Sequence, residues 1–168
     1  MSKIANLEQL YVDQLKDLYS AETQLIKALP EMATAAHAPE LRKGFELHLE
    51  QTREHAHRLE QLLEEFDEKP TGNKCEAMAG LIKEGKKTIS EDAPAAVKDA
   101  ALIAAAQRVE HYEIAGYGCV RTYAALLGDK EGADLLQTTL EEEADTDKKL
   151  SAAASKLNLK AEALASAR

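Results

Sequence analysis

The chain has 168 residues, a formal net charge of −9, 45% hydrophobic residues, 4% aromatic residues and no tryptophan. This acidic balance argues against nucleic acid as a partner, because phosphate backbones attract basic surfaces. No segment approaches about 20 uninterrupted apolar residues, so we expect no membrane span, and the first residues form no apolar signal segment. The sequence therefore predicts one cytoplasmic domain over residues 1–168, with a composition that favours helices.

Apolar residues recur at steps of three and four, the spacing of one face of an α-helix. The first helix is expected over residues 3–36, with Ser2 as its N-cap and a kink rather than an end at Pro30. After a short connection, a second helix is expected over residues 39–67, opening with Pro39. The polar break at residues 68–73 then precedes a shorter helix over residues 74–90.

Two further long helices are expected over residues 94–127 and 131–157, separated by a turn, and the tail at 158–168 is expected to fray. The connections between the four long helices are tight, long and tight in order. In a bundle this order indicates two antiparallel hairpins joined by one crossover. The predicted fold is therefore an all-α, ferritin-like four-helix bundle with an extra short helix in the crossover.

Each long helix carries acids or histidines inside its apolar stripe, where an unpaired charge is costly. In chain order these residues are Glu22, His48, Thr52, His55, Glu113, Glu143 and Asp147, and Glu110 lies one turn before Glu113. Polar groups at matching places in all four stripes indicate one metal-binding layer. A single such group is more often a satisfied core residue, which is the alternative interpretation.

Carboxylate-rich bundles that hold two metal ions use a Glu from each of two helices and a Glu-x-x-His pair from each of the other two. Carboxylates bridge hard cations and imidazole adds a nitrogen ligand, so the expected metal is Fe or Mn, in a site that can be binuclear. Glu22 and Glu113 occupy the single-Glu positions, and Glu143 occupies the key position of the last long helix. Asp147 follows Glu143 where the motif has a His. Tyr117 is placed to hydrogen-bond one of these carboxylates.

The second helix is less clear. At about 100° per residue, His48 and His55 lie on the apolar face, whereas Glu50 lies almost opposite to it. A rotation of this helix beside its kinked neighbour would bring Glu50 inward. The ligand from this helix is therefore left open among His48, Glu50 and His55.

Several segments resemble the YciE/YciF-type ferritin-like family of bacteria: residues 17–25, 48–52, 74–78, 99–107, 109–118 and 139–147. The resemblance extends to about residue 157 and is most specific over Val109–Gly118. It implies a rubrerythrin-like bundle, often dimeric, linked to bacterial stress responses and without an established catalytic activity. It also implies a metal site made from Glu22, Glu50 or its neighbours, Glu110, Glu113, Glu143 and Asp147. Gln51 and Arg53 depart from the pattern, because some relatives have an acid and a His there.

Two functions are compatible with these residues. The first is a di-metal protein, with Fe or Mn, that handles iron, peroxide or oxygen under stress, as a homodimer. The second is a metal-poor structural or interaction protein of the stress response. The lack of an inward-facing Glu-x-x-His pair favours it, because Glu54 and His57 point away from the apolar face. Iron storage in a hollow shell is a weaker third hypothesis. Whether the protein is an enzyme is left open.

Overall fold

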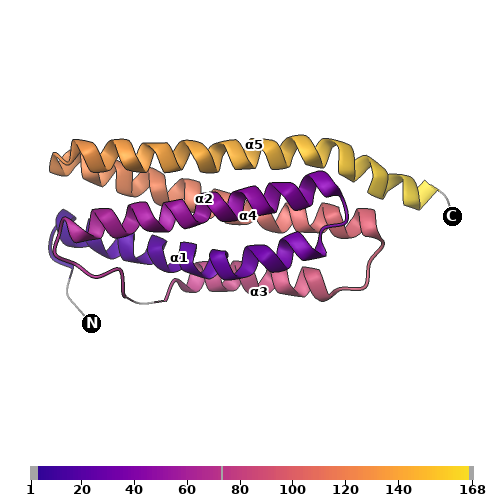
Figure 1. The fold of residues 1–168 in the computed structure, drawn as a ribbon, viewed down its shortest axis with the longest axis horizontal. Helices are drawn as coiled ribbons and strands as arrows, with labels where there is room; N and C mark the ends of the chain where they lie inside the picture. Colours follow the sequence, from indigo (N-terminus) through magenta and orange to yellow (C-terminus); the bar gives the residue numbers. More distant parts are fainter. Residues whose placement is uncertain (1–3, 73, 167–168) are drawn as a thin grey trace.

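The computed structural model describes residues 4–72 and 74–166, with side chains up to residue 164. This part of the chain contains helices and no strand. The helices are α1 (Leu7–Ala35), α2 (Pro39–Glu64), α3 (Glu76–Ser90), α4 (Ala95–Leu127) and α5 (Lys130–Ser166). α1 pairs with α2 and α4 pairs with α5, each as an antiparallel hairpin (Figure 1). The predicted all-α bundle of two hairpins is confirmed.

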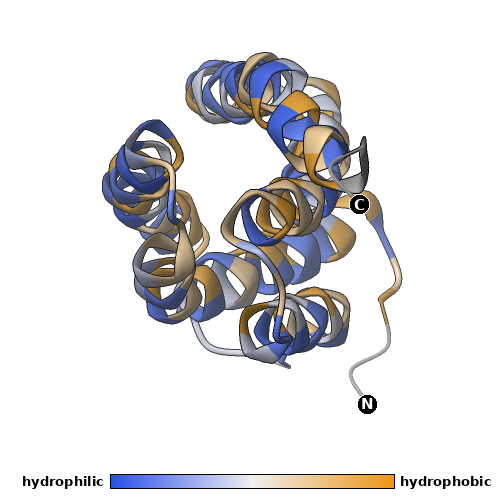
Figure 2. Ribbon diagram, turned by 90° about the vertical axis from the view of Figure 1, so that its right-hand side faces the viewer, coloured by the Kyte–Doolittle hydropathy of each residue, from blue (hydrophilic) through white to orange (hydrophobic). Residues whose placement is uncertain are grey.

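α3 occupies the long connection between the hairpins. It runs along the length of the bundle and packs against α1 and α4 (Figures 1 and 2). The crossover therefore carries the chain from the end of α2 to the opposite end of the bundle, where α4 begins. This is the ferritin-like connection that the order of tight and long loops predicts.

The helix boundaries differ from the expected ones mainly at the two ends of the chain. α1 begins at Leu7 instead of residue 3, because the side chain of Asn6 caps it by accepting a hydrogen bond from the Gln9 N–H at 2.8 Å. The expected cap, Ser2, lies outside the described residues. α1 does continue through Pro30, as expected.

α5 is longer than expected, since it runs to Ser166 instead of ending near Leu157. Two features explain why α5 continues past the expected end. Leu157 is buried in the core and so holds this part of the helix against the bundle. The residues after Asn158 include no Gly or Pro and are rich in Ala, Leu, Lys and Glu, which propagate a helix.

The two tight connections are fixed by specific polar contacts. Between α4 and α5, Gly128 adopts a left-handed conformation with φ of 85° and closes the end of α4. Between α1 and α2, the backbone N–H groups of His37 and Ala38 each donate to the buried carboxylate of Asp99 at 2.8 Å. Asp99 belongs to α4, so this contact ties the first hairpin to the second.

Two buried apolar clusters fill the bundle, one toward each end. One contains Leu25, Leu41, Phe45, Ile103 and Leu150, among others, and the second contains Tyr11, Leu15, Leu59, Val120 and Leu136, among others. Along each long helix, the acids and histidines of the stripe fall between residues of the two clusters. A buried polar layer therefore crosses the middle of the bundle. In the part of the chain that the structure describes, no helix is apolar over enough length to cross a membrane.

Candidate metal centre

Six buried side chains from the four long helices make up the polar layer, and we refer to them as the six-residue cluster. They are Glu22 of α1, His48 and His55 of α2, Glu110 and Glu113 of α4, and Glu143 of α5. Each is at most 3% exposed. His48 and His55 are seven residues apart, two helical turns, so both face the same side of α2.

The cluster divides into two groups of ligand atoms. In each group these atoms lie within 4.8 Å of one another. One group contains His48, Glu110, Glu113 and Glu143, and the other contains Glu22, His55 and Glu143. Glu143 belongs to both. The two groups of ligand atoms therefore meet at the Glu143 carboxylate.

Most of the polar atoms of the cluster lack hydrogen bonds. Nine side-chain atoms have no hydrogen-bond partner among the described residues: one oxygen each of Glu22 and Glu110, both oxygens of Glu113 and Glu143, both ring nitrogens of His48, and Nδ1 of His55. His55 Nδ1 lies 2.8 Å from Glu143 Oε1 but is not aligned with it as a hydrogen bond. Buried polar groups are almost always satisfied in proteins, so a concentration of unsatisfied ones calls for an explanation.

Burial and crowding shift the protonation of the acids. The pKa values of Glu110 and Glu113 are raised well above the ordinary value, first by burial and then by the neighbouring carboxylates. Burial also raises the pKa of Glu22. The pKa of Glu143 moves the other way, because its contacts with His55 and His48 outweigh its burial. The protein alone therefore favours protons on Glu110 and Glu113 and a negative charge on Glu143.

The two histidines differ from each other. Burial lowers the pKa of His48, which favours a neutral ring with a free nitrogen lone pair. Burial acts on His55 in the same direction, but Glu143 and Glu22 outweigh it and raise its pKa to about 10. His55 is thus held as a cation between acids when no metal is present.

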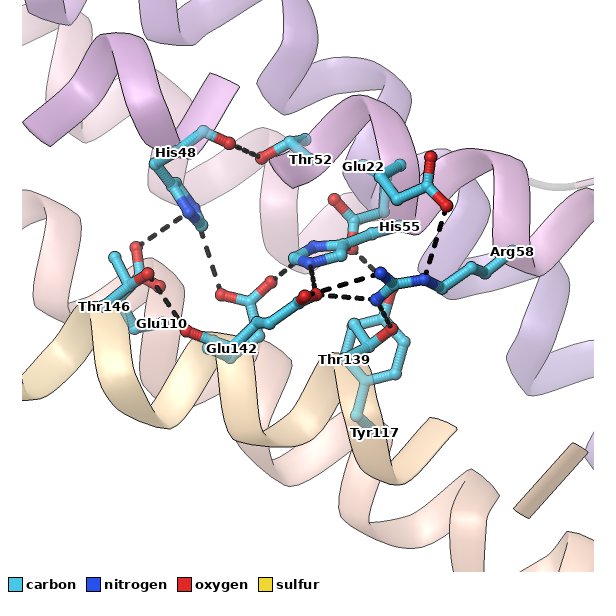
Figure 3. A network of polar contacts seen from close by, with 12 residues as sticks. Glu22, His48, Thr52, His55, Arg58, Glu110, Tyr117, Thr139, Glu142 and Thr146 are labelled. Carbon is cyan, nitrogen blue, oxygen red and sulfur yellow. Dashed lines mark hydrogen bonds and ion pairs between the residues drawn. The ribbon is translucent and has the colours of Figure 1, made fainter. Parts of the chain in front are cut away.

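A second set of contacts orients the cluster from outside (Figure 3). His55 Nε2 lies 2.9 Å from Glu142 Oε2, and since a carboxylate only accepts, the ring nitrogen donates. Arg58 donates to the same oxygen at 2.6 Å and to Thr139 at 3.0 Å. With Nε2 engaged in this way, Nδ1 is the His55 atom that faces the cluster. On the other side, Tyr117 donates a hydrogen bond to Glu22, which agrees with the carboxylate contact predicted for this tyrosine.

Five of the seven residues predicted as ligands lie in the cluster: Glu22, His48, Glu110, Glu113 and Glu143. Glu50 does not. It is exposed and pairs with Arg53, because α2 keeps its apolar face inward and is not rotated toward Glu50. His55, which the sequence left open, takes a place in the cluster.

Asp147 also lies outside both groups. Its carboxylate accepts a hydrogen bond from Gln107 at 3.1 Å and lies 3.4 Å from His111 Nε2. Sequence reasoning also missed Glu142, which the pattern assigns to the solvated face of the last long helix. The one signal for Glu142 was Arg58, a basic residue beside the apolar stripe of α2.

The cluster has the same donors as the di-metal carboxylate motif, four Glu and two His, but in a different distribution. α2 supplies both histidines and no acid, and α4 supplies two acids at positions i and i+3. Oxygen and imidazole donors together suit Fe, Mn and related divalent metals. The chemistry of the residues therefore fits such an ion, even though the cluster contains no Glu-x-x-His pair and the one of α2, Glu54 and His57, is exposed.

Comparison with known proteins gives a consistent result. A family described as a domain of unknown function, DUF892, matches residues 6–163. Protein YciF of Escherichia coli K12 is 46% identical over 158 residues, which cover 93% of this chain and 95% of that protein. The crystal structure of the E. coli stress protein YciF matches with a TM-score of 0.90 and 44% identity, over 94% of this chain and 99% of that one.

Two more solved structures are similar to this chain. YcfI of Rhodopseudomonas palustris, whose description proposes a structural role, has a TM-score of 0.85 and 42% identity, over 89% of this chain and 95% of that one. A dodecameric thioferritin of Bacteroides fragilis has a TM-score of 0.71 and 17% identity, over 94% and 91% of the two chains. At that identity the likeness concerns the fold alone, which is ferritin-like.

Proposed function

The chain belongs to the DUF892 family and has a ferritin-like fold, and on this premise we propose that it is a bacterial stress protein that binds Fe or Mn at the six-residue cluster. One observation carries the proposal: nine buried ligand-type atoms converge from four helices without hydrogen-bond partners among the described residues. A metal ion satisfies such atoms and offsets the repulsion between the acids. The similarity to the E. coli stress protein YciF supports the physiological role.

In the proposed binuclear site, His48, Glu110 and Glu113 would hold one ion and Glu22 and His55 would hold the other, with Glu143 available to both groups. Bound Fe or Mn would supply reversible one-electron oxidation, which suits a role in handling iron, peroxide or oxygen. The protein supplies the rest. It keeps water out by burial, orients His55 through Glu142, and fixes Glu22 through the Tyr117 hydroxyl.

A structural or interaction protein is the second candidate. The protonated His55 between Glu22, Glu142 and Glu143 forms an ion-pair network that stands without metal. The structural role proposed for the related YcfI favours this candidate as well.

The proposal also includes a cytoplasmic location and a homodimer. Light scattering tests the dimer against the 18.3 kDa mass of one chain.

The experiment that separates the two candidates is an anaerobic titration of chelator-treated protein with Fe(II) and with Mn(II). The metal-binding proposal predicts saturation at up to two ions per chain, one for each group of the cluster. Absence of binding of either ion would refute the metal-binding proposal and favour the structural candidate.

The proposed role of Glu142 predicts a loss of affinity without a loss of sites. Glu142→Ala removes the carboxylate that holds His55 Nε2, and outer contacts of this kind typically contribute 10–100-fold in metal affinity. We expect a fall of about that size in Mn(II) affinity at unchanged stoichiometry, measured by calorimetry. Glu142→Gln should recover part of it, because the amide oxygen still accepts from His55. The matched control is Glu141→Ala, an exposed neighbour on α5. Equal affinities in wild type and Glu142→Ala would contradict the role.

The shifted pKa values predict that rising pH lowers the stability of the metal-free protein and increases the stabilisation that metal gives. The metal-free protein should lose stability between pH 6.5 and 10. His55 has a raised pKa of about 10 against an ordinary 6.5, so its stabilising charge is lost across this range. The raised pKa values of Glu110 and Glu113 act in the same direction. The folded state binds protons on these carboxyl groups more tightly than the unfolded state does, so stability falls as rising pH removes them. Metal displaces these protons, so the rise in melting temperature caused by Mn(II) should be larger at pH 8 than at pH 6. A rise that is smaller at pH 8 would contradict this prediction.

A further inference from the structure

A narrow apolar pocket lies between α1, α3 and α4 and leads toward the six-residue cluster. Its walls include Leu25, Leu29 and Met32 of α1, Leu81 and Ile82 of α3, and Val109 of α4. Glu31 and Lys86, which are exposed and form an ion pair at 2.9 Å, line it as well. So does Glu110, which is only 2% exposed and belongs to the cluster. A surface ion pair and a buried candidate ligand therefore line the same pocket.

The size and lining of the pocket restrict what can use it. Its volume is about 40 Å³. One water requires roughly 10–15 Å³ measured in this way, so the space holds a few very small molecules and no organic substrate. A metal ion would lose its hydration along the aliphatic walls between Glu31 and Glu110, which makes this route unfavourable for cations. Apolar cavities of proteins stay dry and accept apolar gases such as xenon.

We propose that this pocket is an entry passage for dioxygen, which ends at Glu110. Dioxygen is small, uncharged and apolar, so it matches both the volume and the walls, whereas hydrogen peroxide would lose its hydrogen bonds with water. The significance of the passage rests on the proposed metal-binding function, because the metal is what the gas would meet beside Glu110. Cations then reach the cluster by a different route from the one that dioxygen takes.

Two glycines of α3 provide a matched pair of variants. Gly85 lines the pocket, and a Cβ built there would meet Met32 Sδ at 3.9 Å, an ordinary contact. The longer side chain of Gly85→Leu would extend into the passage. A Cβ at Gly80 on the same helix meets nothing within 4 Å, and that residue is exposed. Gly80→Leu therefore makes the same change of residue type in α3 without filling the pocket.

The first test uses metal-free protein and so does not depend on the proposed function. Dissolved dioxygen is paramagnetic, and it should speed the ¹H relaxation of the methyl groups of Leu25 and Leu29, which line the pocket and are 3% and 5% exposed. Methyl groups of Leu18 and Leu136, which are 3% and 2% exposed and lie in the other apolar cluster, should respond less. Gly85→Leu should remove the enhancement and Gly80→Leu should keep it. Equal relaxation of the two sets of methyl groups in the wild type would overturn the inference, whether or not the protein binds metal.

The second test measures oxidation of Fe(II) loaded anaerobically into the same variants. Gly85→Leu should slow oxidation by dioxygen about tenfold, which corresponds to an entry barrier raised by roughly 1.4 kcal/mol. Oxidation by hydrogen peroxide and the anaerobic Fe(II) stoichiometry should stay unchanged, and Gly80→Leu should match the wild type. Equal slowing with both oxidants would mean that the substitution disturbs the cluster, and the inference would fail. Absence of Fe(II) binding in the wild type would refute the proposed function instead.

Discussion

Glu143→Gln should abolish metal binding to one group of the cluster and weaken binding to the other by at least about a hundredfold, above the range for outer contacts alone. The reason is that Glu143 belongs to both groups, so its loss removes a ligand from each. An amide oxygen donates less electron density than a carboxylate and carries no charge to balance two cations. The measurement is the anaerobic stoichiometry and affinity for Mn(II).

Two control variants make this result specific. Glu141→Gln makes the same change on an exposed face of α5, two residues away. Glu50→Gln changes the residue that the sequence offered as a ligand and that the fold places on the surface. Both should bind metal as the wild type does. Metal binding that survives Glu143→Gln but falls with Glu50→Gln would place the site on the outer face of α2.

Glu113→Leu should stabilise the metal-free protein and at the same time reduce metal binding. Neither carboxyl oxygen of Glu113 has a hydrogen-bond partner within the described structure, and burial with the nearby charges of Glu22 and Glu143 raises its pKa well above the ordinary value. Replacing buried ionisable groups by apolar residues of similar volume is often neutral or stabilising by about 1–4 kcal/mol. We expect the free energy of unfolding in urea, measured with chelator present, to rise within that range.

The same variant should lose most of the stabilisation that metal gives. For the wild type, binding to the folded state alone contributes roughly 2.7 kcal/mol at a hundredfold excess of Mn(II) over Kd. For a chain of this size that corresponds to a rise in Tm of roughly 5–10 °C. Opposite effects of one substitution with and without metal are expected of a ligand and not of a structural core residue. A Glu113→Leu protein that is less stable in chelator would show that this carboxyl group supports the fold.

The elements and the polar layer were predictable because they depend on spacing within each helix. Leu18, Glu22 and Leu25 share a face of α1 whatever the neighbouring helices do, and the same holds for Glu113 and Tyr117 of α4. The choice between His48 and Glu50 was a question of how far α2 is rotated. Spacing favoured His48, and the fold agrees.

What the sequence could not provide were the contacts between helices. Glu142 follows a run of acids that looks solvated, and only the approach of α2 to α5 brings it to His55 and Arg58. The position of Asp147 outside both groups also involves a contact between helices, because Gln107 of the neighbouring α4 donates a hydrogen bond to its carboxylate. The pairing of two histidines from one helix with two acids from another also escapes a search for Glu-x-x-His. The relevant neighbours of these residues lie across the bundle.

The most direct test of the proposed binuclear site is anomalous X-ray diffraction at the Mn edge, from crystals grown with Mn(II). A binuclear site at the cluster predicts two anomalous peaks inside the bundle, both next to Glu143, one on the side of His48 and Glu113 and the other on the side of Glu22 and His55. Peaks confined to the acidic surface, or an interior without any peak in crystals that hold Mn(II) elsewhere, would contradict it.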